Sequence, residues 1–154
     1  LFRSGTKDTD ACLFKLDADG NVAFYDRFQK DWKSTKDEIL KLEKNANIFI
    51  DSTGVGDSIT EDLQRYFNNM TGYKYTSTTK QQLMESLAVE LAKGGIGYPD
   101  GMIKEELEVF EYQFTATGVR YNAPAGFHDD CVNALALAVR CREKNRHVGV
   151  YRFI

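Results

Sequence analysis

Ile48-Phe-Ile-Asp-Ser-Thr-Gly-Val-Gly-Asp57 is a short apolar run that ends in a carboxylate and continues into a Gly-rich turn. Three apolar residues in a row are typical of a central strand covered on both faces. Such a strand would carry Asp51 to the crevice at the carboxyl end of an open α/β sheet, where ligands bind. Asp51 can equally cap the following turn, and this segment alone does not decide between the two roles.

A second segment, Gly126-Phe-His-Asp-Asp-Cys-Val-Asn-Ala-Leu-Ala-Leu-Ala138, places His128, Asp129 and Asp130 at the opening of an apolar helix. The helix dipole favours an acid there by about 0.3–1 kcal/mol, which is enough to explain one Asp but not two. Neighbouring helical residues point about 100° apart, so one Asp can face the sheet while the other serves the cap or a second metal. Hard divalent cations prefer such oxygen ligands and keep waters that can be activated for hydrolysis. The two segments therefore predict a metal-dependent nuclease.

The rest of the chain predicts a mixed α/β sheet with helices packed on it, because hairpin strands come first and helices alternate with strands afterwards. The expected strands are 10–16, 22–28, 48–50, 73–75, 105–114 and 119–121, and the expected helices are 34–44, 58–69, 79–93 and one that begins after Gly126. Ser34 is the expected N-cap of the first helix.

Composition restricts the class of protein. The 154 residues are enough for one domain with a single core, and no apolar run approaches the ~18 residues of a membrane span. No leader peptide is expected at the start of the chain. The three cysteines show no zinc or disulfide spacing, so we interpret them as small buried hydrophobic residues in a reducing compartment. A net charge of −3 argues against strong unaided binding to nucleic acid, although bound cations would reverse the field of a carboxylate cluster.

The two opening segments, taken with three others, resemble a known family. The full set is Ser4-Gly-Thr-Lys-Asp-Thr-Asp10, Ile50-Asp-Ser-Thr-Gly-Val-Gly56, Thr79-Lys-Gln-Gln-Leu83, Ile103-Lys-Glu-Glu-Leu107 and Tyr121-Asn-Ala-Pro-Ala-Gly-Phe-His-Asp-Asp-Cys-Val-Asn-Ala-Leu-Ala-Leu-Ala138. The chain resembles the C-terminal nuclease domain of the large terminase subunit of tailed bacteriophages over nearly its whole length. That resemblance implies an RNase H-like fold: a mixed central sheet, helices on both faces and an auxiliary β-hairpin over 110–121 that flanks the DNA groove.

The resemblance also implies a site in which acidic residues bind two Mg²⁺ or Mn²⁺ ions. Asp51 matches the family's second acid, and Asp129 and Asp130 match the third, with Asp129 the first choice as ligand. Asp8 matches a further acid that can approach the metals, and His128 could orient the attacking water or serve only the turn. Expected DNA contacts are the basic residues Arg3, Lys7, Lys80, Arg120 and Arg140, although a surface lysine is the safer interpretation of Lys80 and a solvated helix end is the plainer interpretation of Arg140.

The implied role is cleavage of double-stranded viral DNA concatemers during packaging in the cytoplasm of the bacterial host. The implied partners are the terminase ATPase domain, the portal and the small terminase subunit, with no membrane. The family's first acid would fall immediately before Leu1, and the chain holds no Walker A motif. We therefore expect a single nuclease domain over 1–154 with a shortened first strand, without the ATPase domain, and with weak or no activity as it stands.

Two alternatives remain open at this point. The chain can be a DNA-guiding or docking module of the packaging motor with an incomplete metal site. It can also be an actin-like or kinase-like nucleotide-binding domain that uses the turn at Gly54 and Gly56 on phosphates. That turn lacks the Lys-Ser/Thr pair of a P-loop, which counts against a nucleotide. Asp57 fits a helix cap better than a metal ligand.

Overall fold

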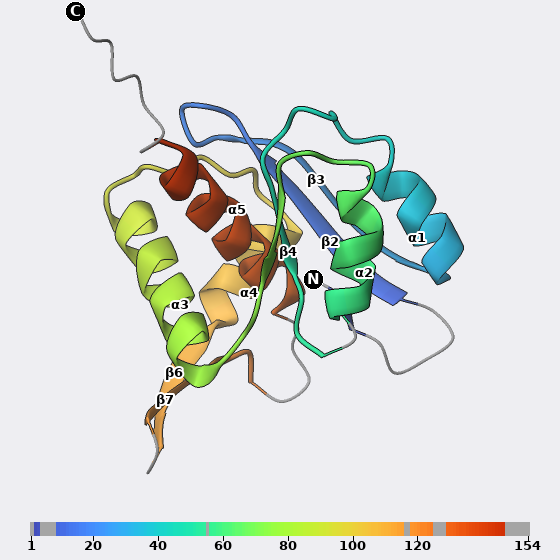
Figure 1. Cartoon of the computed structure of the whole chain (residues 1–154). Coiled ribbons are helices and arrows are strands. Elements are labelled where there is room, and N and C mark those ends of the chain that lie inside the picture. Colours follow the sequence, from blue (N-terminus) through green and yellow to red (C-terminus); the bar gives the residue numbers. More distant parts are fainter. Residues whose placement is uncertain (1, 4–8, 55, 116–117, 125–128, 147–154) are drawn as a thin grey trace, which may run out of the picture.

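A computed structural model describes residues 2–3, 9–54, 56–115, 118–124 and 129–146 of the chain (Figure 1). Its elements, in chain order, are β1 (Phe2–Arg3), β2 (Thr9–Leu16), β3 (Val22–Lys30), α1 (Trp32–Ile39), β4 (Ile48–Asp51), α2 (Gly56–Gln64), β5 (Met70–Tyr73), α3 (Ser77–Ala92), α4 (Met102–Val109), β6 (Glu111–Thr115), β7 (Gly118–Asn122) and α5 (Asp130–Arg146). No helix of the described part is both long and apolar enough to cross a membrane.

The described strands form three hydrogen-bonded groups. β1, β2 and β3 make an antiparallel sheet, β4 and β5 pair in parallel, and β6 and β7 form a separate hairpin. α5 packs against both β2 and β4 and so joins the first two groups. The parallel pair ends with Asp51 opposite Tyr73, so the carboxylate stands at the carboxyl end of the two strands.

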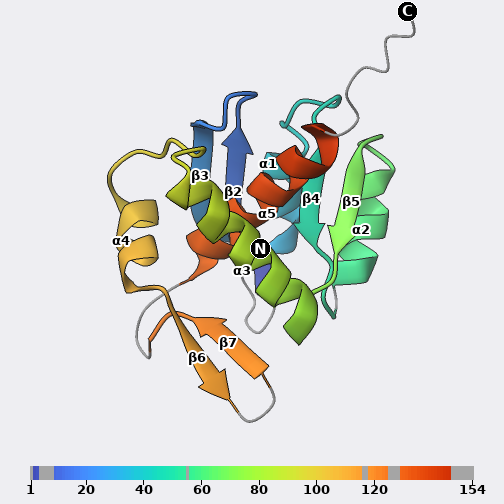
Figure 2. The same ribbon diagram turned by 90° about the vertical axis from the view of Figure 1, so that its left-hand side faces the viewer.

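Helices cover both faces of these strands, as predicted. In Figure 2, α3 and α5 lie in front of the strands, and α1 and α2 lie behind them. The front layer contains a core that includes Leu83, Leu87 and Leu135, and the back layer contains a second core around Leu63 and Phe67. The mixed α/β fold class is therefore confirmed, and its auxiliary hairpin is β6–β7.

α5 is the most buried helix of the front layer. Almost every residue from Cys131 to Val139 is buried, on all sides of the helix. A helix that is apolar all round is normally found inside a protein core. Its first turn, which carries the two candidate acids, is therefore held in place by the core.

The cysteines are buried and free, as predicted. The thiols of Cys12 and Cys131 lie 3.4 Å apart. The hydrogen bond with Cys12, together with burial, raises the pKa of the Cys131 thiol, so the Cys131 sulfur stays protonated in the core.

Several predicted boundaries were wrong. Residues 105–109 belong to helix α4, and only 111–115 form the strand that was expected to begin at 105. α1 begins earlier than predicted because Asp31, and not Ser34, is its N-cap: the Asp31 side chain accepts from the Ser34 N–H at 2.9 Å. The fifth strand ends at Tyr73, where the prediction had it begin.

Candidate metal centre

Asp51 ends β4 and is only 8% exposed. Its Oδ1 accepts a hydrogen bond of 2.9 Å from the Thr53 N–H, and the next residue, Gly54, takes a φ of 64°. A positive φ is comfortable for glycine, so the chain can turn sharply straight after the strand. A carboxylate has two oxygens. The cap uses Oδ1, and within the described part of the chain Oδ2 accepts no hydrogen bond, so the two roles considered for Asp51 are compatible.

α5 runs antiparallel to β4, and this brings its first turn to the carboxyl end of that strand. Near the far end of the helix, the Cys141 thiol donates to the Asn47 carbonyl just before β4, at 3.4 Å. From Cys141 back to Asp130 the helix spans about 16 Å at 1.5 Å per residue, and from Asn47 to Asp51 the strand spans about 13 Å at 3.3 Å per residue. Asp51 and the start of α5 therefore lie at the same level.

Tyr75 connects these two carboxylates. It follows β5, and its backbone N–H donates to the Thr53 hydroxyl at 2.9 Å. Its own hydroxyl is buried and has no hydrogen-bond partner among the described residues. Burial raises the pKa of Tyr75, and the negative charges of Asp51 and Asp129 raise it further, so both carboxylates act on the same phenol. We call Asp51, Tyr75 and Asp129 the Asp51–Asp129 site.

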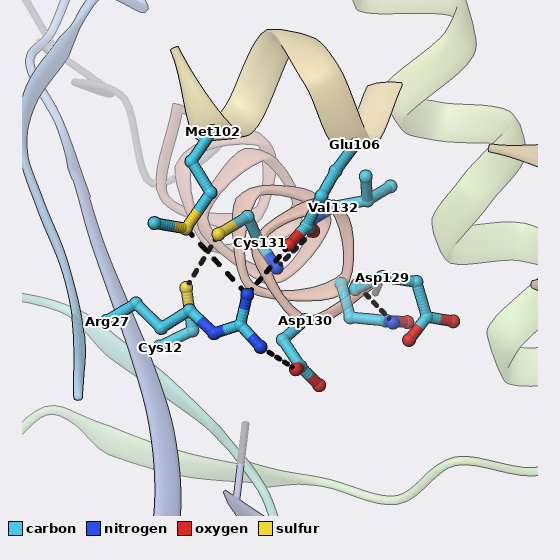
Figure 3. Close-up of polar contacts among 9 residues, drawn as sticks. Cys12, Arg27, Met102, Glu106, Asp129, Asp130, Cys131 and Val132 are labelled. Carbon is cyan, nitrogen blue, oxygen red and sulfur yellow. Dashed lines mark hydrogen bonds and ion pairs between the residues drawn. The ribbon is translucent and has the colours of Figure 1, made fainter. Parts of the chain in front are cut away.

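Asp129 and Asp130 point to different partners. The Asp129 carboxylate is 15% exposed, and its ion-pair partner in the described part of the chain is Lys80, at a long 3.9 Å. Asp130 instead accepts from the Arg27 guanidinium at 3.0 Å, and the same guanidinium reaches Glu106 at 3.3 Å (Figure 3). The two neighbouring acids therefore have different partners: Lys80 on α3 for Asp129, and Arg27 on β3 for Asp130.

The other predicted site residues are less well placed. Lys80 lies on α3, and its ammonium group is 3.9 Å from the Asp129 carboxylate. Arg140 lies about 15 Å along α5 from Asp130, at 1.5 Å per residue, and pairs with Glu143 at 3.2 Å. Arg3 lies on β1 and Arg120 on β7. Lys7, Asp8 and His128 lie outside the described residues.

Arg142, two residues after Arg140 on α5, has a structural role. Arg142 donates to the Ala18 carbonyl at 3.1 and 3.3 Å and lies 3.7 Å from Glu90. With only 9% of its side chain exposed, it holds the β2–β3 turn against α5.

The donor set fits a hard divalent cation. Among the described residues, no three His, Cys, Asp or Glu side chains gather into a protein-only cage. Mg²⁺ does not need one, because it keeps several waters and is usually bound by one or two carboxylates together with substrate phosphates. Two carboxylates beside a buried hydroxyl that lacks a partner match that requirement.

Three residues that shape this site were not predicted. Arg27 contacts Glu106 across 79 residues of sequence and Asp130 across 103 residues, and no local pattern reveals contacts at such separations. Glu106 stood in a segment interpreted as a strand. Tyr75 was noted only as part of a strand, although its position just beyond β5, next to the strand that ends in Asp51, is the one signal that could have identified it.

The strand order and flanking helices, with carboxylates at the end of β4 and the start of α5, define an RNase H-like domain. No protein-family model matches the chain. It is 34% identical over 143 residues to the terminase large subunit of Thermus phage G20c, which covers 86% of this chain and 29% of that protein. It is 39% identical over 97 residues to the terminase large subunit of Thermus virus P23-45, covering 61% of this chain and 20% of that protein. The chain thus spans less than a third of these curated relatives.

Solved structures give the same result over the domain itself. The large terminase nuclease of phage G20c with bound magnesium superposes with a TM-score of 0.70 at 26% identity, covering 90% of this chain and 89% of that one. A structure of the same nuclease with bound cobalt gives a TM-score of 0.69. The nuclease domain of the Thermus phage P74-26 large terminase gives 0.73 at 29% identity, covering 90% and 74%. The predicted family is confirmed: this chain is a relative of the nuclease domain of terminase large subunits.

Proposed function

We propose that the chain is a divalent-metal-dependent DNA endonuclease domain. The observation that carries the proposal is the placement of Asp51 at the end of β4 and Asp129 at the start of α5, where the charges of both act on the buried Tyr75, in a chain related to terminase nucleases. The solved relatives with bound magnesium and cobalt support a hard divalent cation, Mg²⁺ or Mn²⁺, at these carboxylates.

In this proposal Asp51 and Asp129 hold the cation, while Asp130 serves the fold. A pair of such cations flanking the scissile phosphate would supply an activated water and stabilise the leaving oxygen. Asp51 presents the carboxylate oxygen that its cap leaves over. Tyr75 stays protonated and donates a hydrogen bond into the site, and Lys80 places a positive charge where a phosphate would approach Asp129. His128 and Asp8 remain candidates for orienting water and for a further ligand.

We further propose that the substrate is double-stranded viral DNA, cut from concatemers during genome packaging in the host cytoplasm. The working enzyme would be a longer terminase subunit in which this domain acts with an ATPase domain, the portal and the small subunit.

Cleavage of supercoiled plasmid in Mn²⁺ and in Mg²⁺ tests the proposal. The chain should be compared with Asp51→Ala, Asp129→Ala and the control Asp37→Ala, which changes an exposed acid on α1. The same set should be made in a polypeptide that begins upstream of Leu1. Loss of cleavage in the first two variants only would support the proposal. Intact plasmid and no Mn²⁺ binding even by the longer polypeptide would refute it.

The second candidate is a DNA-guiding module without chemistry, favoured by the absence of a three-member acidic cluster among the described residues. It would bind DNA equally well with or without Mn²⁺, and the Asp129→Ala variant would bind DNA as the unchanged chain does.

A further inference from the structure

The start of α5 lacks the local cap that its sequence offers. Asp129 is the residue before the helix, and its backbone carbonyl accepts the Asn133 N–H at 3.0 Å. An Asp in this position usually turns its carboxylate onto the backbone N–H groups two and three residues later. Those groups belong here to Cys131 and Val132, and neither donates to Asp129.

A carboxylate from another helix takes both of these N–H groups. Glu106 Oε2 accepts from Cys131 at 2.8 Å and from Val132 at 3.3 Å, while Oε1 of the same carboxylate pairs with Arg27 (Figure 3). Glu106 is only 6% exposed. It satisfies two donors that would otherwise be unpaired at a buried helix end.

We propose that Glu106 is a positioning residue for the metal centre, because it caps α5 in place of Asp129. This inference rests on the proposed function. Because Glu106 caps the helix, the Asp129 carboxylate is left available for the cation. Arg27 completes the arrangement by holding Asp130 at 3.0 Å, so that the neighbouring acid does not compete for the same position.

Without Glu106, the Asp129 carboxylate would be drawn to cap the helix instead of binding the cation. Cys131 and Val132 would present two unpaired N–H groups, and a small rotation of the Asp129 side chain would bring its carboxylate onto them. A cation would then have to displace that cap before it binds. The free energy of one N-cap corresponds to roughly a 2- to 30-fold change in an equilibrium, and this is the expected loss in Mn²⁺ affinity.

Three substitutions of Glu106 distinguish the effect of its side-chain length from the effect of its charge. Glu106→Gln keeps the length and an acceptor oxygen but loses the charge. Glu106→Asp keeps the charge but is one methylene too short to cap both N–H groups, and Glu106→Ala loses both properties. If capping is what matters, Mn²⁺ affinity measured by calorimetry will be highest in the Gln variant and lowest in the Asp and Ala variants.

A different ranking of the three variants by Mn²⁺ affinity would overturn the proposal. If the Asp variant binds better than the Gln variant, the charge near the cation is the cause, and if all three bind as the unchanged chain does, the role is structural. Leu63→Ala, in the core of the opposite face, controls for lost stability alone. The Gln and Asp variants decide the question even if the Ala variant fails to fold. Absence of Mn²⁺ binding by the unchanged chain would instead overturn the proposed function and, with it, this inference.

Discussion

Asp129→Asn and Asp130→Asn should affect different properties, although the residues are adjacent: the first should lower metal affinity and the second should lower stability. Asp130 and Arg27 are 9% and 23% exposed at 3.0 Å. Removing one partner of a fully buried ion pair costs about 3–5 kcal/mol. Arg27 keeps Glu106 at 3.3 Å and the Asn oxygen can still accept, so we expect a smaller loss, about 1–2 kcal/mol. Asp129 loses only a pair to Lys80 at 3.9 Å, which is worth about 0–1 kcal/mol.

Thermal unfolding in EDTA and Mn²⁺ calorimetry measure the two effects separately. For a domain of this size, about 1 kcal/mol shifts Tm by roughly 2–4 °C. Asp130→Asn should therefore lower Tm by about 2–8 °C and leave the Mn²⁺ affinity of the folded protein within about threefold. Asp129→Asn should leave Tm within about 4 °C and lower Mn²⁺ affinity by at least about a hundredfold, more than the loss of an outer-shell partner causes.

The reverse pattern would refute this reasoning. If Asp130→Asn abolished Mn²⁺ binding at unchanged Tm, Asp130 would be the ligand, and its pairing with Arg27 would belong to the metal-free protein only. If both variants lost binding and neither lost stability, the two acids would share the cation, and the separation of their roles would be wrong.

Four further predictions concern individual side chains. Leu135→Ala removes a fully buried residue of the front core and should cost about 2–5 kcal/mol in denaturant unfolding, whereas Val89→Ala, at a 50% exposed position, should cost under about 0.5 kcal/mol. Tyr75→Phe deletes a buried hydroxyl that has no described partner, so Tm without metal should stay equal or rise while metal-dependent cleavage falls. The Tyr75 pKa is raised, so its absorbance should show no ionisation near pH 10, and stability should fall as pH rises above 10, where the unfolded chain loses that proton first. The Glu38 pKa is lowered to about 2, chiefly by Lys30, so its small, salt-sensitive stabilisation is present above pH 4.5 and lost as pH falls toward 2, which an NMR titration against Glu38→Gln would detect.

The parts of the fold that could be predicted are those encoded by local patterns. The apolar run before Asp51 and the Ala/Leu-rich run after Asp130 identified β4 and α5, because burial on all sides leaves an uninterrupted hydrophobic segment. From these two elements, the sequence predicted Asp51 at a strand end and Asp129 and Asp130 at a helix start, which is where the structure has these residues.

The parts that could not be predicted depend on contacts distant in sequence. Only Phe110 separates helix α4 from strand β6, so apolar residues of the two elements merge into one ambiguous pattern. Within it, nothing local distinguishes the buried Glu106 from its exposed neighbour Glu105. What distinguishes them is the position of Arg27 and of the first turn of α5, which only the folded chain brings together.

The separation of roles between Asp129 and Asp130 follows from the burial of α5. Consecutive residues of a helix point about 100° apart, so two adjacent acids cannot face the same partner. Here one points toward Arg27 on β3 and the other toward Lys80 on α3. The helix cannot rotate to exchange them, because Cys131, Val132 and Leu135 are fully buried and any rotation would expose apolar surface. Core packing therefore fixes which acid faces Arg27 and which faces Lys80, and in the proposed function Asp130 serves the fold while Asp129 holds the cation.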